Sequence, residues 1–318
     1  MTRTKKVVVI GGGHGQSCIL RGIKNIDNIE ISAIVTVADD GGSTGRIRER
    51  YYMPAMGDIR NVIISLSDQE SIFKTLMDFR FESNDEEDSD IAGHNLGNLI
   101  LTALTQVQGS FMESIMSVSK ILNVKGNIIP STYQVITLFA KMEDGTIVRG
   151  EKNIPNKQNR IRKVFYQREV KAAPEAIKAI EEADLIIYGI GSLYTSILPN
   201  IIINDIQNAL CRSKGKKIYF SNCVTQIGET DNYTLEEHAD ALLRHKAPLD
   251  IVIYANDIIP TKVIDKYEKS ESKLVKIAKD IHDYEIIKTN LLEFDNDLIR
   301  HSPAKIEKTV KKLMKRID

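Results

Sequence analysis

Cysteine is scarce in this chain, and long apolar runs are absent. The three cysteines, Cys18, Cys211 and Cys223, are too far apart for a CxxC metal or redox motif. No apolar run approaches the roughly 20 residues of a membrane-spanning helix, and the first run, Val7–Ile10, is too short for a signal peptide. Lysine plus arginine and aspartate plus glutamate both number 43, which argues against binding to nucleic acid or a membrane surface through overall charge. We therefore expect a cytoplasmic, reduced protein.

The composition is that of an ordinary globular protein, with 42% apolar and 27% charged residues in 318. The chain opens with an apolar strand at Val7–Ile10, a glycine-rich loop, a helix at Gln16–Ile23 and a second strand at Ile31–Val37. This order is typical of a doubly wound sheet. We predict one α/β domain over residues 1–318, built on a Rossmann-like, mainly parallel sheet.

The middle of the chain differs in pattern. Further helices are expected at Arg60–Ser67, Ser71–Phe79, His94–Val107 and Phe111–Leu122, with an acidic loop at Ser83–Asp90. Short strands then follow at Ile128–Pro130, Gln134–Met142, Thr146–Gly150 and Arg160–Val164, with a hairpin turn at Glu143–Thr146. We interpret Lys125–Arg168 as a small antiparallel insertion.

Alternation of helix and strand resumes at Pro174. The expected helices are Pro174–Glu182, Ile201–Arg212, Leu235–His245 and Lys305–Arg316, and the expected strands are Asp184–Gly189, Lys217–Phe220, Asp250–Tyr254 and Glu285–Lys288. The apolar stripe of Ile201–Leu210 would suit either a homodimer face or the core, and the core is the commoner use.

The loop ADDGGSTGR at 38–46 is the most informative segment. It follows the second strand, so it lies at the carboxyl edge of the sheet, where open α/β folds bind ligands. Ser43 and Thr44 can hold oxygens of a ligand. The pair Asp39 and Asp40 would suit Mg²⁺, a ribose or a sugar, although Asp40 could instead cap the following helix.

Two other loops are rich in glycine. Gly12, Gly13 and His14 belong to a loop that departs from GxGxxG, because Gln16 occupies its last position; it suits a phosphate or sugar near a helix N-terminus, or is simply a tight turn. Gly191 and Ser192 follow the strand at Asp184–Gly189 and form a second candidate anion cradle.

Polar residues also gather in three more segments. Asn222, Thr225, Gln226 and Glu229 follow the strand at Lys217–Phe220. Asp58 and Arg60 stand near a helix start. His94, Asn95 and Asn98 open another helix, where asparagine can read a base or sugar edge and His94 would act as a general base or, more commonly, as a capping or surface residue.

Taken together, the motifs resemble the CofD-like family, and within it the YvcK branch of bacterial gluconeogenesis factors. The similar segments are DDGGSTG (39–45), PAMGDIR (54–60), GHNLGN (93–98), GIGSLYTS (189–196) and NCVTQIGET (222–230). The third glycine-rich segment departs from the usual GPGSLYTS, because Ile190 replaces proline.

The resemblance implies a ligand site at the carboxyl edge of a Rossmann-like core. The YvcK branch looks like a binder of nucleotide sugars of the UDP-N-acetylglucosamine type, linked to cell shape and peptidoglycan supply during gluconeogenic growth, with no established catalysis. Tyr267 and Arg300 are further ligand residues by this resemblance, and a cell-wall or morphogenesis protein is an expected partner. The other branch implies an alternative, a Mg²⁺-dependent 2-phospho-lactate transferase.

Overall fold

The computed structural model describes residues 3–68, 72–82, 90–157 and 159–317. The centre of the fold is a seven-stranded sheet in the order β10-β9-β8-β7-β1-β2-β3, and every neighbouring pair is parallel. The strands are β1 (Lys5–Gly11), β2 (Ile29–Val35), β3 (Asn127–Pro130), β7 (Leu185–Tyr188), β8 (Lys216–Phe220), β9 (Ile251–Ala255) and β10 (Glu285–Thr289). The expected Rossmann-like α/β class is confirmed.

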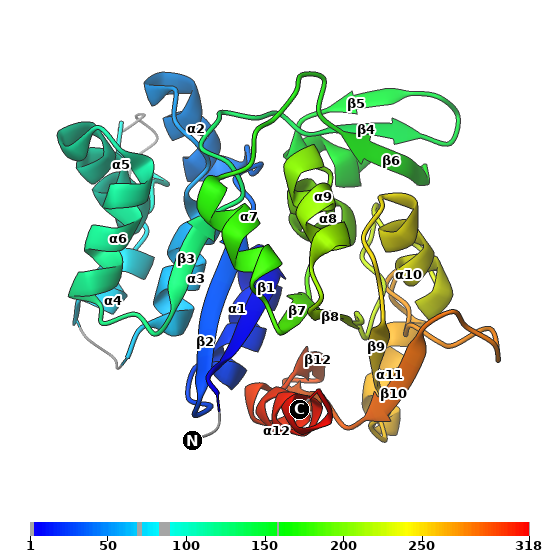
Figure 1. Ribbon diagram of the computed structural model, residues 1–318. Helices are drawn as coiled ribbons and strands as arrows, with labels where there is room; N and C mark the ends of the chain where they lie inside the picture. Colours follow the sequence, from blue (N-terminus) through cyan, green and yellow to red (C-terminus); the bar gives the residue numbers. More distant parts are fainter. Residues whose placement is uncertain (1–2, 69–71, 83–89, 158, 318) are drawn as a thin grey trace.

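The inner strands are apolar on both faces because helices cover both sides of the sheet. In β1, Val7, Val8, Val9 and Ile10 are all buried. On one face α1 (Gly13–Ile23) packs against α3 (Gly57–Leu66) and α12 (Pro303–Arg316); the other carries α7 (Pro174–Glu181), which packs against α9 (Asn204–Arg212) (Figure 1).

The described part of the connection from β2 to β3 holds four more helices besides α3. They are α2 (Gly42–Tyr51), α4 (Ile72–Asp78), α5 (Leu96–Gln108) and α6 (Phe111–Ile121). Figure 1 shows α5 and α6 side by side beyond the β3 edge. Within the expected acidic loop, residues 83–89 lie outside the described part of the chain.

The second half supplies α8 (Leu198–Ile201), α10 (Leu235–Arg244) and α11 (Thr261–Glu268), and a hairpin of β11 (Leu292–Asp295) with β12 (Leu298–His301). The expected single helix over Ile201–Arg212 is wrong. The helical conformation is interrupted at Ile203, whose backbone is extended with φ −73° and ψ 119°, and α9 begins at Asn204. A five-residue π-helix, η2 (Leu193–Ile197), precedes α8.

The insertion is a three-stranded antiparallel sheet of β5 (Ile147–Arg149), β4 (Phe139–Met142) and β6 (Ile161–Phe165), with a 3₁₀ helix, η1 (Glu151–Asn156), between β5 and β6. Two details differ from the expectation. The strand at 127–130 belongs to the main sheet, because it pairs in parallel with β2. Residues 134–138 lie outside β4, and the carbonyl oxygen of Ile136 accepts a hydrogen bond from Arg48 instead of a ladder bond.

Among the helices of the described residues, none combines the length and the apolar character needed to cross a membrane. The division into one domain with an insertion at 125–168 stays a prediction.

Candidate functional site

The order of the strands reverses between β1 and β7, so the loops after these two strands leave in different directions. Ligands of open α/β sheets bind in the crevice at such a switch point. Two glycines let the loops meet there. A Cβ on Gly15 would lie 2.0 Å from the carbonyl oxygen of Ile190, and Gly191, with φ +141°, places its missing Cβ 3.6 Å from the oxygen of Gly12. Close backbone contact therefore requires glycine at Gly15, whereas at Gly191 the positive φ favours it.

A cavity of about 450 Å³ opens beside the loop after β7. Its wall includes five residues expected from the sequence: Gly191, Ser192, Asn222, Thr225 and Gln226. The amide of Asn222 is fixed at both ends, because Nδ2 donates to the oxygen of Gly191 (3.0 Å) while Oδ1 accepts from the hydroxyl of Tyr219 (3.0 Å). The loops after β7 and β8 thus form one wall.

Glu229 is buried behind this wall. Its carboxylate accepts hydrogen bonds from the backbone N–H of Tyr194 (3.2 Å), the hydroxyl of Thr195 (3.0 Å) and the amide of Gln226 (2.8 Å). Burial raises the pKa of Glu229 to about 7, against the effect of these donors. Glu229 therefore organises the wall. Thr225 is also committed to structure, since its hydroxyl accepts from the backbone N–H of Lys273 (2.8 Å).

The adjacent carboxylates Asp39 and Asp40 have different partners. Oδ1 of Asp39 accepts from the N–H of Gly41 (2.8 Å), whereas Oδ1 of Asp40 accepts from the N–H of Lys152 in η1 (3.0 Å). The capping role considered for Asp40 is wrong, because the N-cap of α2 is Gly41 and no side chain caps it. Asp40 instead ties the loop after β2 to the insertion.

Asp58 stands in the first turn of α3 and faces the first glycine loop. A Cβ on Gly12 would lie 2.4 Å from Oδ2 of Asp58. Burial, followed by the charge of Asp39, raises the pKa of Asp58 to about 7, and a hydrogen bond from the backbone of Gly13 opposes the shift. Burial likewise raises the pKa of Asp39. The start of α3, which carries Asp58, therefore meets the first glycine loop and lies near Asp39.

Glu151 of η1 also belongs to this group, although no sequence pattern marks it. Burial and then the charges of Asp39 and Asp40 raise its pKa to about 8, with smaller contributions from Glu229 and Asp58. Five carboxyl groups from four segments thus influence one another. Within the described residues, no set of three or more histidine, cysteine, aspartate or glutamate side chains is already arranged to hold a metal ion.

A hydrogen-bonded network links α2 to the start of α5. The hydroxyl of Ser43 lies 3.0 Å from Nδ1 of His94 and accepts from the N–H of Asn95 (3.2 Å) and the amide of Asn98 (3.3 Å). Asn95 caps α5, since its side chain accepts from the N–H of Asn98. Both acceptor positions of the Ser43 oxygen are used, so this serine is not a free nucleophile.

Arginines support the network from behind. Nη1 of Arg60 is 3.5 Å from Oδ1 of Asn98, and the amide of Asn98 also reaches the hydroxyl of Thr44 (3.4 Å). Arg48, which the sequence analysis missed, is buried, and its Nη1 donates to the backbone carbonyl oxygen of Asp39 (2.6 Å). Its only signal in the sequence is its place one turn after Gly45, which an exposed helix arginine would share.

Three expected residues lie apart from these contacts. His14 is exposed in the first turn of α1. Tyr267 in α11 accepts a hydrogen bond from the N–H of Ile299 (3.2 Å) and lines a different cavity. Arg300 is exposed on β12, whose alternation turns its neighbour His301 inward, into the cavity beside Gly191.

Comparisons with known proteins identify the family of this chain. The profile of the family described as 2-phospho-L-lactate transferase CofD matches residues 7–292. A protein named Gluconeogenesis factor from Bacillus subtilis (strain 168) is 41% identical over 323 residues, which cover 99% of this chain and 100% of that protein. A Putative gluconeogenesis factor from Thermotoga maritima is 39% identical, covering 97% and 99%.

A solved structure agrees with them. The crystal structure of a upf0052 family member from Bacillus halodurans has a TM-score of 0.89 and 39% identity, and it covers 96% of this chain and 99% of that one. The family match extends over most of the chain, the relatives named are similar in sequence over nearly their whole length, and the Bacillus halodurans protein also shares the fold. The chain therefore belongs to the CofD family and lies, within it, among the gluconeogenesis factors.

Proposed function

We propose that this protein is a cytoplasmic regulatory protein that binds a nucleotide sugar of the UDP-N-acetylglucosamine type. Its role would be in cell shape and peptidoglycan supply during gluconeogenic growth. The observation that carries the proposal is the meeting of loops from β1, β2, β7 and β8 at the switch point. The hydroxyl oxygen of Ser43, which lies 3.0 Å from Nδ1 of His94 at the start of α5, already accepts from two neighbouring N–H groups, so this pair does not supply a free nucleophile.

The positions of the carboxylates indicate where each part of such a ligand would lie. Carboxylates and phosphates repel each other unless a cation lies between them. The diphosphate would therefore lie near the backbone N–H group of Ser192, and it would approach Gly13, whose own N–H donates to Asp58, only with a cation between the two anions. The sugar or base would lie near Asn222, whose amide keeps one N–H for a ligand, and near Gln226, whose Oε1 can accept from a hydroxyl because its two N–H groups already donate to Ser192 and Glu229.

A magnesium ion fits the acidic side of this arrangement. Mg²⁺ prefers oxygen ligands and is held in proteins by one or two carboxylates together with substrate phosphates. Asp39 and Asp58 would supply the carboxylates, because the charge of Asp39 acts on Asp58 beside the first glycine loop, whereas Asp40 is directed toward η1 by the N–H of Lys152. The bound ion would supply charge neutralisation for the phosphates.

Isothermal titration with UDP-N-acetylglucosamine, with and without Mg²⁺, tests this proposal. We expect saturable binding that Mg²⁺ strengthens and that Asp39→Asn weakens at least about tenfold, the effect of one charge-assisted contact. Asp27→Asn, at an exposed turn before β2, is the matched control and should bind as the wild type does. No heat of binding at millimolar ligand would refute the proposal.

The family profile and the acidic cluster favour one alternative, a Mg²⁺-dependent transferase of the 2-phospho-lactate type. Phosphoryl chemistry can depend mainly on positioning and metal charge, so it does not require a free nucleophile. Formation of a transfer product that requires Mg²⁺ and is lost in Asp39→Asn would support the enzyme. Binding without any product would support the regulator.

A further inference from the structure

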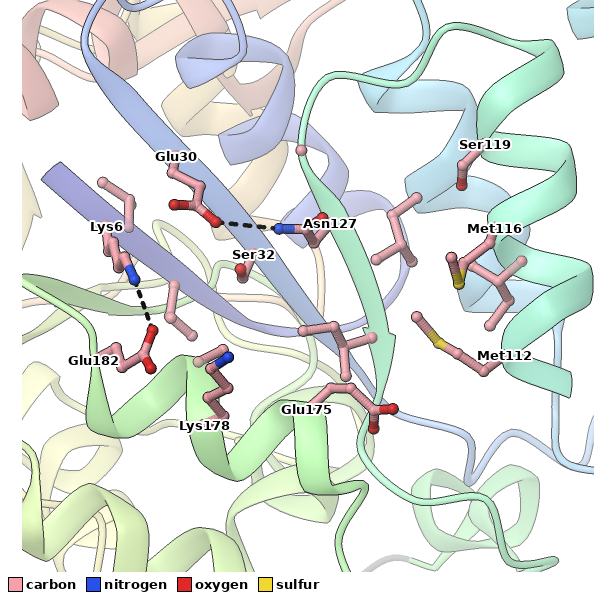
Figure 2. Close-up of a pocket in the computed structure, with 17 residues that line it drawn as sticks. Lys6, Glu30, Ser32, Met112, Met116, Ser119, Asn127, Glu175, Lys178 and Glu182 are labelled. Atoms are coloured by element: carbon pink, nitrogen blue, oxygen red, sulfur yellow. Dashed lines mark hydrogen bonds and ion pairs between the residues drawn. The ribbon is translucent and has the colours of Figure 1, made fainter. Parts of the chain in front are cut away.

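A second cavity, of about 470 Å³, lies over the first halves of β1, β2 and β3. It shares no lining residue with the cavity beside Gly191. Figure 2 shows the three strands as its floor, α6 as one wall and α7 as the other. Its volume is in the range of pockets that bind small molecules.

The register of the strands builds the floor. Val8 pairs with Ser32, and Ser32 pairs with Asn127, so the three side chains form a row across one face of the sheet. Two residues earlier in both strands, and so on the same face of the sheet, Lys6 pairs with Glu30. The floor is therefore polar toward the strand starts.

The walls differ in character. Met112, Ile115 and Met116 stand at i, i+3 and i+4 on α6 and present an apolar, polarisable face to the cavity. On α7, Lys178 and Ala179 face the cavity between two glutamates. A ligand would lie with its apolar part against α6 and its polar end toward α7.

The carboxylates that line the cavity have hydrogen-bond donors, whereas some of the lining donors have no acceptor among the residues that the structure describes. Each glutamate already has a donor: Glu182 pairs with Lys6 (2.6 Å), Glu175 accepts from the hydroxyl of Tyr133 (2.6 Å), and Glu30 faces the amide of Asn127 (3.5 Å).

Three lining groups keep unused donors. Lys178 and Ser32 make no hydrogen bond or salt bridge with the described residues, and the hydroxyl oxygen of Ser119 is buried without a partner there. Lys178 and Ser32 are therefore the lining groups whose donors a ligand would use, on a wall that also carries the carboxylates of Glu175 and Glu182.

We propose that this cavity binds a small molecule with an apolar body and one carboxylate. The carboxylate would accept from Lys178 and Ser32, while the apolar body would contact Met112, Met116 and Val8. This inference is independent of the function proposed above, because the two cavities have no residue in common.

Methionine-methyl NMR tests the proposal, with octanoate as the probe and octylamine as its cationic match. The chain has eight methionines, and Met→Leu variants assign their signals. We expect octanoate to shift the methyl signals of Met112 and Met116 in a saturable way and to leave Met53 and Met56 unchanged. Octylamine should bind more weakly.

Two variants complete the design. Lys178→Gln should weaken octanoate binding about fivefold, as expected for one exposed ion pair, whereas Lys214→Gln, at another exposed lysine, should not. Ala179→Phe should fill the cavity and abolish the shifts.

Three results would overturn the proposal: octylamine binding as tightly as octanoate, all methionines shifting with one midpoint, or Lys178→Gln binding octanoate unchanged. Sedimentation that shows a dimer broken by Ala179→Phe would make the cavity a contact between copies of the chain, which also refutes it.

Discussion

Oδ1 of Asp40 accepts a 3.0 Å hydrogen bond from the backbone N–H of Lys152, across 112 residues of the chain. Gly150, with φ +91°, lies against the other oxygen, since a Cβ there would be 2.7 Å from Oδ2. On the opposite side of η1, a Cβ on Gly228 would lie 1.8 Å from the oxygen of Pro155. The loops after β2 and β8 therefore hold η1 between them and position Glu151.

Replacement of Asp40 should loosen this contact in a way that depends on the acceptor. Asp40→Ala removes the acceptor of the Lys152 N–H, so the amides of residues 151–154 and 156 should exchange with solvent about tenfold faster, as expected for the loss of one hydrogen bond. Asp40→Asn keeps a carbonyl oxygen and should exchange nearly as the wild type does. Hydrogen–deuterium exchange measures both variants, and equal rates in all three proteins would contradict the role given to Asp40.

Gly228 should be far less tolerant of a side chain than Gly109. Both have positive φ, +77° and +70°, but a Cβ on Gly109 meets nothing within 4 Å. Gly109→Ala should therefore cost about 1 kcal/mol of unfolding free energy from backbone strain alone. Gly228→Ala adds a clash with backbone and should cost about 3 kcal/mol or more. Urea unfolding compares the two, and equal losses would show that η1 moves aside freely.

The part of the site that could be predicted from the sequence is the part that strand ends determine. A buried strand followed by a polar loop, such as Ile31–Val37 before Asp39, fixes the loop at the carboxyl edge because all strands of the sheet are parallel. The meeting of Gly12 with Asp58 could not be predicted, since it depends on where α3 crosses the sheet.

Glu151 illustrates the larger gap. It belongs to the insertion, and no local pattern shows that η1 folds back between two ligand loops. The sequence places the expected strand at Ile128–Pro130 in that insertion for the same reason. A short apolar run carries no information about which strand it pairs with, and only the pairing with β2 places β3 in the main sheet.

His94 should carry its proton on Nε2 and be mostly neutral at pH 6.5. The Ser43 oxygen accepts from two N–H groups, so its own hydrogen is left to donate to Nδ1 of His94. Burial, helped by the charges of Arg46 and its arginine neighbours, lowers the pKa of His94. Long-range ¹H–¹⁵N NMR should therefore report the Nε2–H tautomer at pH 6.5, where a free histidine would be half protonated. An Nδ1–H signal, or a charged ring, would contradict this hydrogen-bond assignment.

Glu229 should make the protein less stable as the pH rises through neutrality. Burial raises its pKa from 4.5 to about 7, so the folded state holds this proton more tightly than the unfolded chain does. The stability linked to this proton is fully present below pH 4.5 and is lost as the pH rises through about 7. For an uncoupled carboxyl the loss would be about 3 kcal/mol.

The variant Glu229→Gln removes this titration and should reduce the dependence of unfolding free energy on pH between 5 and 8, and the remaining slope should come from Asp58 and Glu151. Glu143→Gln, at an exposed position in the β4–β5 hairpin, should keep the wild-type slope. Guanidinium unfolding at a series of pH values gives both slopes. If Glu229→Gln retains the wild-type slope, the hydrogen bonds from Tyr194, Thr195 and Gln226 outweigh burial, and Glu229 is ionised throughout.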